Sequence, residues 1–314
     1  MVSRNYVIKY NKFPNIDFIE GILSNWLWED DFTYSYFLRG LHIKNNICTY
    51  EAYYNEMLVG LITAWKSEYH QNCSYFSIVT KPQFGFEIES VLIKALLNFK
   101  EFKLPLQTSI WETSYKLKLF YEKSGFLEVR RTYMPSLRIS KIDIDQVFPE
   151  FNGQDVYIKD ISSISNNQKL KFKLIHLVRE NYEKTHKVNP VAAQSFEKWE
   201  ELIFNEETIQ NGSYIVLGDN EILAYSLLHY SNTPNKFEFG WRGVNGNTDI
   251  RLMLLLTAYQ INFAIENRVK CIKAEVDTTD YFSVEMLKFF PFSPAPSLLT
   301  FQKRANYELN PQRL

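Results

Sequence analysis

The sequence has little cysteine and no excess of charge of either sign. Its three cysteines, Cys48, Cys73 and Cys271, are far apart and form no CxxC pair, so they predict neither a disulfide framework nor a zinc site. Lys and Arg number 35 against 36 Asp and Glu, a formal net charge of -1. Proteins that bind nucleic acid usually carry a basic field. The balanced charge therefore predicts no nucleic-acid partner.

Long apolar runs are missing too. No stretch approaches the ~20 apolar residues needed to cross a bilayer, and the first residues lack the apolar block of a secretory signal. These absences predict a cytoplasmic protein without a membrane partner. The five histidines show no HExxH spacing and no GxSxG motif occurs, so neither a metal site nor a serine hydrolase is predicted.

What the sequence does have is length and an internal repeat. With 314 residues, 46% of them hydrophobic, the chain is long enough for two domains. Predicted hairpins turn at Asn55-Glu56 and Asp219-Asn220, and strands that end at Val79 and Val244 each lead through a loop into an apolar helix. Val79 and Val244 are 165 positions apart in the numbering, and so are Glu56 and Glu221 of the two hairpins.

Each half thus reads as strand, helices, antiparallel strands, helix, strand, helix, strand. This order predicts an α+β fold in each half and not a regular βαβ ladder. The predicted bounds are 1–140 for the first domain, 141–154 for a linker rich in acidic, Pro and Gly residues, and 155–314 for the second domain.

One helix end carries a recognisable motif. FYEKSGF, at 120–126, places a glycine where a left-handed residue can end a helix, followed by a phenylalanine that can fold back. With this motif, and with the strand, loop and long helix that follow Val79 and Val244, the chain resembles the GNAT acyl-CoA N-acyltransferases. The resemblance covers nearly the whole chain as two tandem GNAT-like domains, each a mixed central sheet flanked by helices.

The resemblance implies acetyl-CoA as acyl donor, no metal, and an amine of a small molecule or peptide as acceptor. It also implies two candidate catalytic residues. Tyr121 occupies the position of a general acid for the departing thiolate, and Glu238, six residues before Val244, that of a base that deprotonates the amine through water. In the other half Leu287 and Cys73 hold these positions. The alternatives are a packing role for Tyr121 and a solvated strand position for Glu238.

The resemblance also places the CoA pyrophosphate at the loop before the long helix, where backbone N–H groups and the helix dipole favour an anion. The candidates are Val79, Gln83 and Gly85 in the first half, and Val244, Gly246, Asn247, Thr248 and Arg251 in the second. Glu87 and Glu89 follow the first loop, and we expect them to point away and complement the helix dipole. The second loop is electrostatically the better cradle, although Asp249 opposes Arg251.

These residues predict an N-acyltransferase that works by direct attack of the amine in a ternary complex. Both loops lack the glycines of the family motif, so a catalytically inactive GNAT-fold binding or interaction module is the alternative. A more remote alternative is an aminoacyl transferase that uses aminoacyl-tRNA, which would need a basic groove.

Overall fold

The computed structural model describes residues 5–81, 84, 86–151, 157–218 and 221–305, and they form two mixed sheets. In spatial order the first sheet comprises β1 (Val7–Tyr10), β2 (Asn46–Tyr54), β3 (Met57–Lys66), β4 (Ser74–Thr80), β5 (Leu106–Trp111), β14 (Ser297–Lys303), β6 (Leu127–Tyr133) and β13 (Val276–Asp277). The second comprises β7 (Ser136–Arg138), β12 (Cys271–Ala274), β11 (Lys236–Val244), β10 (Glu221–Tyr230), β9 (Tyr214–Gly218) and β8 (Tyr157–Asp160). The predicted α+β fold with two mixed sheets is confirmed.

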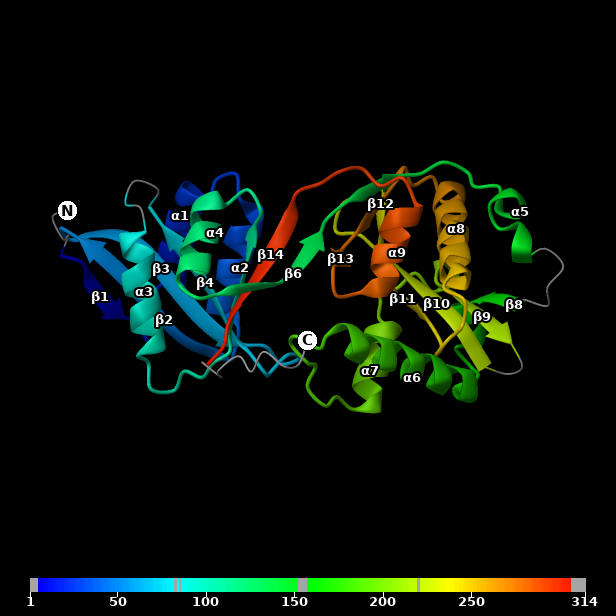
Figure 1. Cartoon of the computed structure of the whole chain (residues 1–314), viewed down its shortest axis with the longest axis horizontal. Coiled ribbons are helices and arrows are strands. Elements are labelled where there is room, and N and C mark those ends of the chain that lie inside the picture. Colours follow the sequence, from blue (N-terminus) through cyan, green and yellow to red (C-terminus); the bar gives the residue numbers. More distant parts are fainter. Residues whose placement is uncertain (1–4, 82–83, 85, 152–156, 219–220, 306–314) are drawn as a thin grey trace, which may run out of the picture. The chain divides into compact units, whose positions relative to one another are not determined.

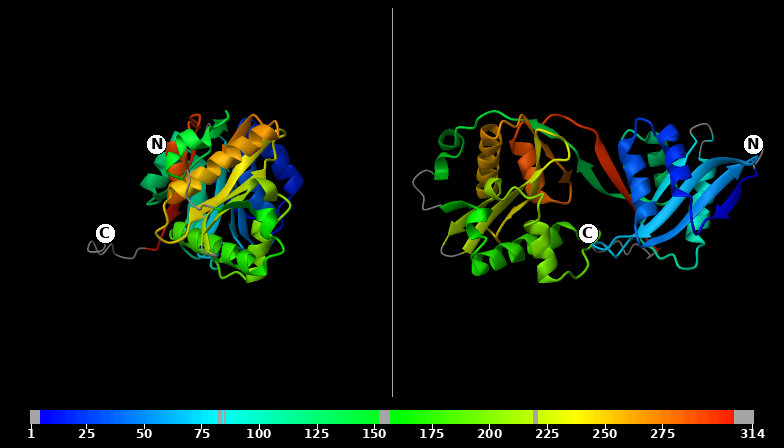
Figure 2. Two further views of the ribbon diagram at one scale, coloured as in Figure 1. Left: turned by 90° about the vertical axis from the view of Figure 1, so that its right-hand side faces the viewer. Right: turned by 180° about the vertical axis from the view of Figure 1, so that it is seen from behind.

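The same layers occur twice. On the first sheet, α1 (Ile16–Trp26) and α2 (Asp31–His42) pack on one face, and α3 (Glu87–Leu97) and α4 (Tyr115–Lys123) contribute to the core on the other. On the second, α6 (Gln168–Thr185) contacts β10 and β11 from one side together with α7 (Phe196–Ile203). The other face carries α8 (Arg251–Glu266) and α9 (Tyr281–Phe289), and Figure 2 shows α8 and α6 on opposite sides of these strands. A short helix, α5 (Ile144–Val147), precedes β8.

The chain divides into two compact units. Unit 1 comprises Met1–Val129, Asn189–Ala192 and Leu299–Leu314, and unit 2 comprises Arg130–Val188 and Ala193–Leu298. The domain bounds inferred from the sequence, 1–140 and 155–314 with a linker at 141–154, follow the repeat and stay a prediction. Residues 152–154 of that linker lie outside the described residues.

The last strand of each half of the sequence lies in the other half's sheet. β14 stands between β5 and β6 in the first sheet, where Figure 1 shows it in red beside β6. β7 pairs antiparallel with β12 at the edge of the second sheet. Each sheet is therefore completed by a strand that the repeat in the sequence assigns elsewhere.

The turns follow their sequence signals where they can be compared. Asn55 and Glu56 have φ of 47° and 62°, the left-handed pair that a two-residue hairpin turn requires, and they join β2 to β3. The matching turn predicted at 219–220 lies outside the described residues.

Among the helices within the described ranges, none combines the length and apolar character needed to span a bilayer.

The predicted helix end at Gly125 is confirmed. Gly125 has φ of 77°, its N–H donates to the Glu122 carbonyl at 3.2 Å, and the N–H of Phe126 donates to the Tyr121 carbonyl at 3.0 Å. These two bonds form a Schellman motif, and Phe126 is 2% exposed in the core of the first sheet. The glycine thus turns the chain so that Phe126 can pack beneath α4.

Gly125→Ala should lower the free energy of unfolding by about 1 kcal/mol, because a Cβ is disfavoured at positive φ. Gly21→Ala is the matched control, since Gly21 is exposed within α1 and an added Cβ there meets no atom within 4 Å. That change should stabilise the protein by roughly 0.5–1 kcal/mol. Denaturant titrations of both variants would check the signs, and a stabilising Gly125→Ala would contradict the left-handed helix end.

Candidate active site

The second sheet opens between its two parallel strands. β11 and β12 pair from Lys236 with Cys271 to Phe239 with Ala274, and beyond this point β11 continues to Val244 without β12 beside it. Two neighbouring parallel strands that separate leave room at the carboxyl end of the sheet, which is where ligands bind in many α/β proteins.

A β-bulge lies at the same place. On the β10 side of β11, Leu228 pairs with Phe239 and Ser226 pairs with Arg242, so Gly240 and Trp241 together stand opposite Leu227. The extra residue turns the side chain of Trp241 toward Tyr182 of α6, 5.1 Å between ring centroids, and that of Arg242 toward α8 and α9. Bulges commonly redirect side chains beside functional sites.

A small pocket of about 30 Å³ lies at this opening. Polar side chains from several elements face it. Asn181 lies on α6 and His186 directly follows that helix, Tyr225 lies on β10 and Arg242 on β11, and Asp280 directly precedes α9. Thr185 and the aromatic rings of Tyr182, Trp241 and Phe282 form the rest of its wall. The pocket therefore combines a cation, an anion and aromatic surfaces in one small space.

Arg242 is the cation, and its side chain is almost fully buried, with 2% of the residue exposed. Its Nη1 donates to Thr257 Oγ1 at 3.1 Å and to Met286 Sδ at 2.7 Å, and its Nε and Nη2 donate to the Gly240 carbonyl. Burial lowers the pKa of Arg242 to about 10, although the charges of Asp280 and Tyr225 oppose this effect. The guanidinium remains protonated at neutral pH.

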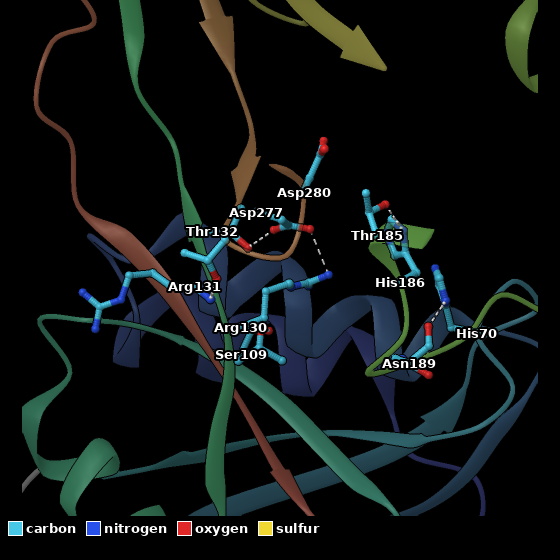
Figure 3. A network of polar contacts seen from close by, with 12 residues as sticks. His70, Ser109, Arg130, Arg131, Thr132, Thr185, His186, Asn189, Asp277 and Asp280 are labelled. Carbon is cyan, nitrogen blue, oxygen red and sulfur yellow. Dashed lines mark hydrogen bonds and ion pairs between the residues drawn. The ribbon is translucent and has the colours of Figure 1, made fainter. Parts of the chain in front are cut away.

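Asp280 is the anion, and it also caps α9. Its Oδ1 accepts hydrogen bonds from the N–H groups of Phe282 and Ser283, and its Oδ2 accepts one from the Ser283 hydroxyl. Burial raises the pKa of Asp280, against the lowering effect of Ser283 and of Arg242. The nearby Asp277 is held differently, because Arg130 and Thr132 both contact its carboxylate (Figure 3).

Tyr225 and Asn181 complete the polar wall. Burial raises the pKa of Tyr225, while the Asn181 side chain lowers it, so its phenol is protonated at neutral pH. Asn181 also donates from Nδ2 to the carbonyl of Val244 at 3.1 Å. The last carbonyl of β11 is therefore engaged by α6, and Val244 itself is buried at 5% exposure.

The loop after β11 offers free backbone donors. Gly246 has φ of 53° with open space around it, and the N–H groups of Gly246, Asn247 and Ile250 have no hydrogen-bond partner among the described residues. The Thr248 N–H instead donates to the Asn245 carbonyl at 3.0 Å. These donors adjoin the positive end of α8, so the residues present fit an anionic group such as a pyrophosphate.

Arg251, the predicted charge partner of that anion, is already engaged. Its Nε lies 2.7 Å from Glu150 Oε1, and its guanidinium lies 5.8 Å from the ring centroid of Phe148. Its side chain is 43% exposed. The Arg251 N–H donates to Asp249 Oδ1 at 2.9 Å, so Asp249 caps the first turn of the helix.

Solved structures with this architecture are GNAT proteins. A GCN5-related N-acetyltransferase from Sphaerobacter thermophilus matches 95% of this chain over 95% of its own, with a TM-score of 0.57 at 12% identity. A tandem GNAT protein from the clavulanic acid biosynthesis pathway matches 96% of this chain over 98% of its own, with a TM-score of 0.55 at 9% identity. The protein has a tandem GNAT fold.

A third similar structure is the glucosamine N-acetyltransferase region of a fungal multi-domain GH3 β-N-acetylglucosaminidase, with a TM-score of 0.67 at 9% identity. It matches 96% of this chain, but this chain spans only 38% of that protein. No protein-family model matches the sequence, and neither does any curated protein. The likeness therefore establishes the GNAT fold.

The candidate base predicted on β11 lies outside the pocket. Glu238 is half-buried on β11, with His229 as its neighbour on β10 and Lys273 as its neighbour on β12. Burial raises the pKa of Glu238, and the charge of Lys273 lowers it. Tyr121 lies in unit 1 and Glu238 in unit 2, so each stays a separate prediction.

Tyr121 is enclosed in the core of the first GNAT sheet. It is fully buried, and the rings of Phe76, Phe120, Phe126 and Phe301 have centroids 5.2–5.8 Å from its own. Burial raises its pKa and the charge of Glu89 raises it further; Thr108 is a polar neighbour but makes no hydrogen bond of normal geometry with the phenol. This environment is that of a packing residue.

The start of α3 differs from the start of α8 in charge. Glu87 is exposed and accepts a hydrogen bond from the Tyr6 hydroxyl at 3.0 Å, as expected of an outward carboxylate. Glu89 was expected to point away as well, but it is 5% exposed and its Oε1 accepts a 2.7 Å hydrogen bond from Thr80. Its position in the first turn of the helix, two residues after Glu87, brings it onto the apolar face that packs on the sheet. A carboxyl group thus faces inward where the GNAT resemblance places the pyrophosphate helix.

The other first-half candidates add no ligand contact. Val79 is buried on β4 against α1 and α2, and Gln83 and Gly85 lie outside the described residues. Cys73, at the position that Glu238 holds in the second half, is buried and accepts a hydrogen bond from Gln302 Nε2 at 3.1 Å.

Sequence reasoning missed the pocket residues. Arg242 follows three aromatic residues in the strand FEFGWRGV, and a cation inside a buried strand is a usable signal. Asp280 is a predictable helix cap in DTTDYFS. That both side chains face Tyr225 and Asn181 depends on the bulge and on the packing of α6, which no local pattern in the sequence specifies.

Glu89 should make the stability of the protein depend on pH. Burial raises its pKa above the unfolded value of 4.5, so its contribution to stability is complete below that value and is lost as the pH rises through the folded pKa. Relative to wild type, Glu89→Gln should therefore gain on the order of 1 kcal/mol in free energy of unfolding between about pH 4 and pH 8. Urea titrations at several pH values would measure this gain.

The control for the Glu89 experiment is Glu87→Gln, which removes a carboxylate from the same turn at an exposed position. The gain of Glu89→Gln must exceed that of this control. Parallel pH profiles for wild type and Glu89→Gln would contradict an inward, buried carboxylate.

Proposed function

We propose that the protein is an N-acyltransferase whose second unit moves an acetyl or other acyl group from CoA to a primary amine. The GNAT fold supports acyl transfer in general. The observation that carries the finer proposal is the coincidence in unit 2 of the opening between β11 and β12, the polar pocket and the free N–H groups of the loop before α8. In unit 1 the inward carboxylate of Glu89 opposes an anion at the corresponding helix.

The residues of the second unit supply complementary roles. The N–H groups of Gly246, Asn247 and Ile250, with the positive end of α8, hold the pyrophosphate of the acyl donor. The donor supplies the activated acyl group. Asp280 faces the pocket as a proton acceptor whose raised pKa brings it closer to that of an amine, and Tyr225 faces it as a protonated phenol.

The reaction balances with one proton released. The neutral amine nitrogen attacks the thioester carbonyl carbon, a C–N bond forms, the C–S bond breaks, and the departing thiolate takes a proton. Asp280 accepts one proton from the ammonium form of the acceptor, and Tyr225 can donate one to the thiolate. The second proton that the nitrogen loses as the amide forms restores Tyr225, and the proton held by Asp280 is the one released to solvent. Glu238 remains a second candidate base, because burial raises its pKa too.

Acetyl-CoA should raise the melting temperature of the wild-type protein. A ligand at ~100 times its Kd stabilises the folded state by about 2.7 kcal/mol, which corresponds to a rise of a few degrees. Asn247→Glu should reduce this rise, because it places a carboxylate beside the free N–H groups that hold the pyrophosphate. Thermal unfolding at several acetyl-CoA concentrations would measure both effects.

The control for acetyl-CoA binding is Glu87→Lys at the start of α3, which should keep the wild-type rise because the cofactor binds the other unit. No rise in the wild type would contradict the acyltransferase proposal. If Asn247→Glu left the rise in melting temperature unchanged and Glu87→Lys altered it, the acetyl-CoA site would be assigned to unit 1 instead.

Substitutions of two buried tyrosines, Tyr225 in unit 2 and Tyr121 in unit 1, would show which unit catalyses the reaction. Tyr225→Phe should lower the rate of CoA release by about 10²-fold, since it removes the proton donor of the proposed site. Tyr121→Phe should leave the rate nearly unchanged and the free energy of unfolding within about 1 kcal/mol, because its hydroxyl makes no hydrogen bond of normal geometry. A 10²-fold loss in Tyr121→Phe alone would instead support its role as general acid in the first unit.

A further inference from the structure

The two charged side chains of the pocket in unit 2 line the same space but do not form an ion pair with each other. Arg242 and Asp280 both line the pocket, and no carboxylate oxygen of the described residues lies within 4.0 Å of a nitrogen of Arg242. A buried charge is costly unless it is paired or fully hydrogen-bonded. The pocket therefore has a cationic side at Arg242 and an anionic side at Asp280, and these two charges are not paired with each other.

Each of these two groups has hydrogen-bonding capacity left. A guanidinium has five N–H donors, and the four contacts of Arg242 to Gly240, Thr257 and Met286 leave one N–H of Nη2 over. A carboxylate offers about four acceptor positions, and the three bonds to Phe282 and Ser283 leave one on Asp280. A ligand that satisfies both presents an acceptor to Arg242 and a donor to Asp280.

The other groups at the pocket fit a small charged head. His186 is turned to its own helix, with Nδ1 2.8 Å from the Tyr182 carbonyl and 3.0 Å from Thr185 Oγ1, the second of which Figure 3 draws. Tyr182 and Trp241 present ring surfaces, which attract an ammonium group. The volume of about 30 Å³ admits a head group of a few atoms, while the remainder of the ligand extends outward.

We propose that the acyl acceptor is a free α-amino acid, bound with its carboxylate at Arg242 and its ammonium group at Asp280. A zwitterion is the small head group that complements both charges at once. This inference rests on the proposed acyltransfer by unit 2 and adds the class of acceptor. The α-nitrogen is the nucleophile: its ammonium form gives one proton to Asp280, and it then forms the C–N bond as the C–S bond breaks. The thiolate takes a proton from Tyr225, and the second proton that the nitrogen loses as the amide forms restores Tyr225.

The test compares acceptors that differ only in the head group. CoA release is measured with the common L-amino acids, and the best of these is then compared with its carboxamide and with the amine that lacks the carboxyl group. The amino acid should have a kcat/KM about tenfold or more above both, because each analogue leaves Arg242 without an anionic partner. Equal kcat/KM for the carboxamide or the decarboxylated amine would overturn the proposal.

Binding measurements test the proposed amino-acid site separately from the proposed acetyl-CoA site. Asp280→Asn keeps a capping side chain at the start of α9 but removes the charge, so it should weaken binding of the amino acid alone, measured by calorimetry, by about tenfold or more. The rise in melting temperature with acetyl-CoA should persist in this variant. Failure of that rise already in the wild type would reject the acyltransferase. A normal rise with no amino-acid binding, or with binding that Asp280→Asn leaves unchanged, would reject only the acceptor class.

Two further variants complete the design. Asp277→Asn is the matched control, because Arg130 and Thr132 already hold that carboxylate, and it should leave amino-acid binding unchanged. Arg242→Gln should remove the preference for the amino acid over its carboxamide. If Arg242→Gln does not fold, the acceptor comparison in the wild type and the Asp280→Asn variant still decide the proposal.

Discussion

The end of the pairing between β11 and β12 is the constraint on which the site depends. As long as the two strands are hydrogen-bonded, up to Phe239 and Ala274, the sheet is closed and its faces pack on helices. Where the pairing stops, β11 carries its bulge, and Arg242 and Trp241 leave the strand on the sides of α8 and α6. The pocket, its buried charges and the open loop before α8 all follow from this separation.

The two units show how one backbone plan can hold different chemistry. In unit 1 the interior beneath α3 and α4 holds the ring of Tyr121 with its four aromatic neighbours, and the carboxyl group of Glu89 also faces inward. In unit 2 the corresponding helices enclose Arg242, whose charge is dispersed over a hydroxyl, a sulfur, a carbonyl and the ring of Phe239. The side chains, and not the order of elements, distinguish the packed interior of unit 1 from the polar pocket of unit 2.

Local patterns were sufficient for much of the fold and for little of the site. The turn at Asn55 and Glu56 and the helix end at Gly125 require left-handed residues, so composition predicts them. The loop after Val244 could be located because it follows a strand and precedes an apolar helix. The inward turn of Glu89 depends on which face of α3 meets the sheet, and that depends on tertiary packing. The exchange of β7 and β14 between the two sheets could not be predicted from the sequence, because an internal repeat suggests that each half forms a complete sheet of its own.

That exchange affects the order in which the protein can fold. Chains made on the ribosome usually complete their N-terminal domain first. Here the first sheet has a place between β5 and β6 that only β14, residues 297–303, fills. Until residues 297–303 have been synthesised, the edges of β5 and β6 lack that partner, and unpaired edges are sites of aggregation. The first sheet thus contains the earliest strand of the chain, β1, and is completed only once β14 has been made.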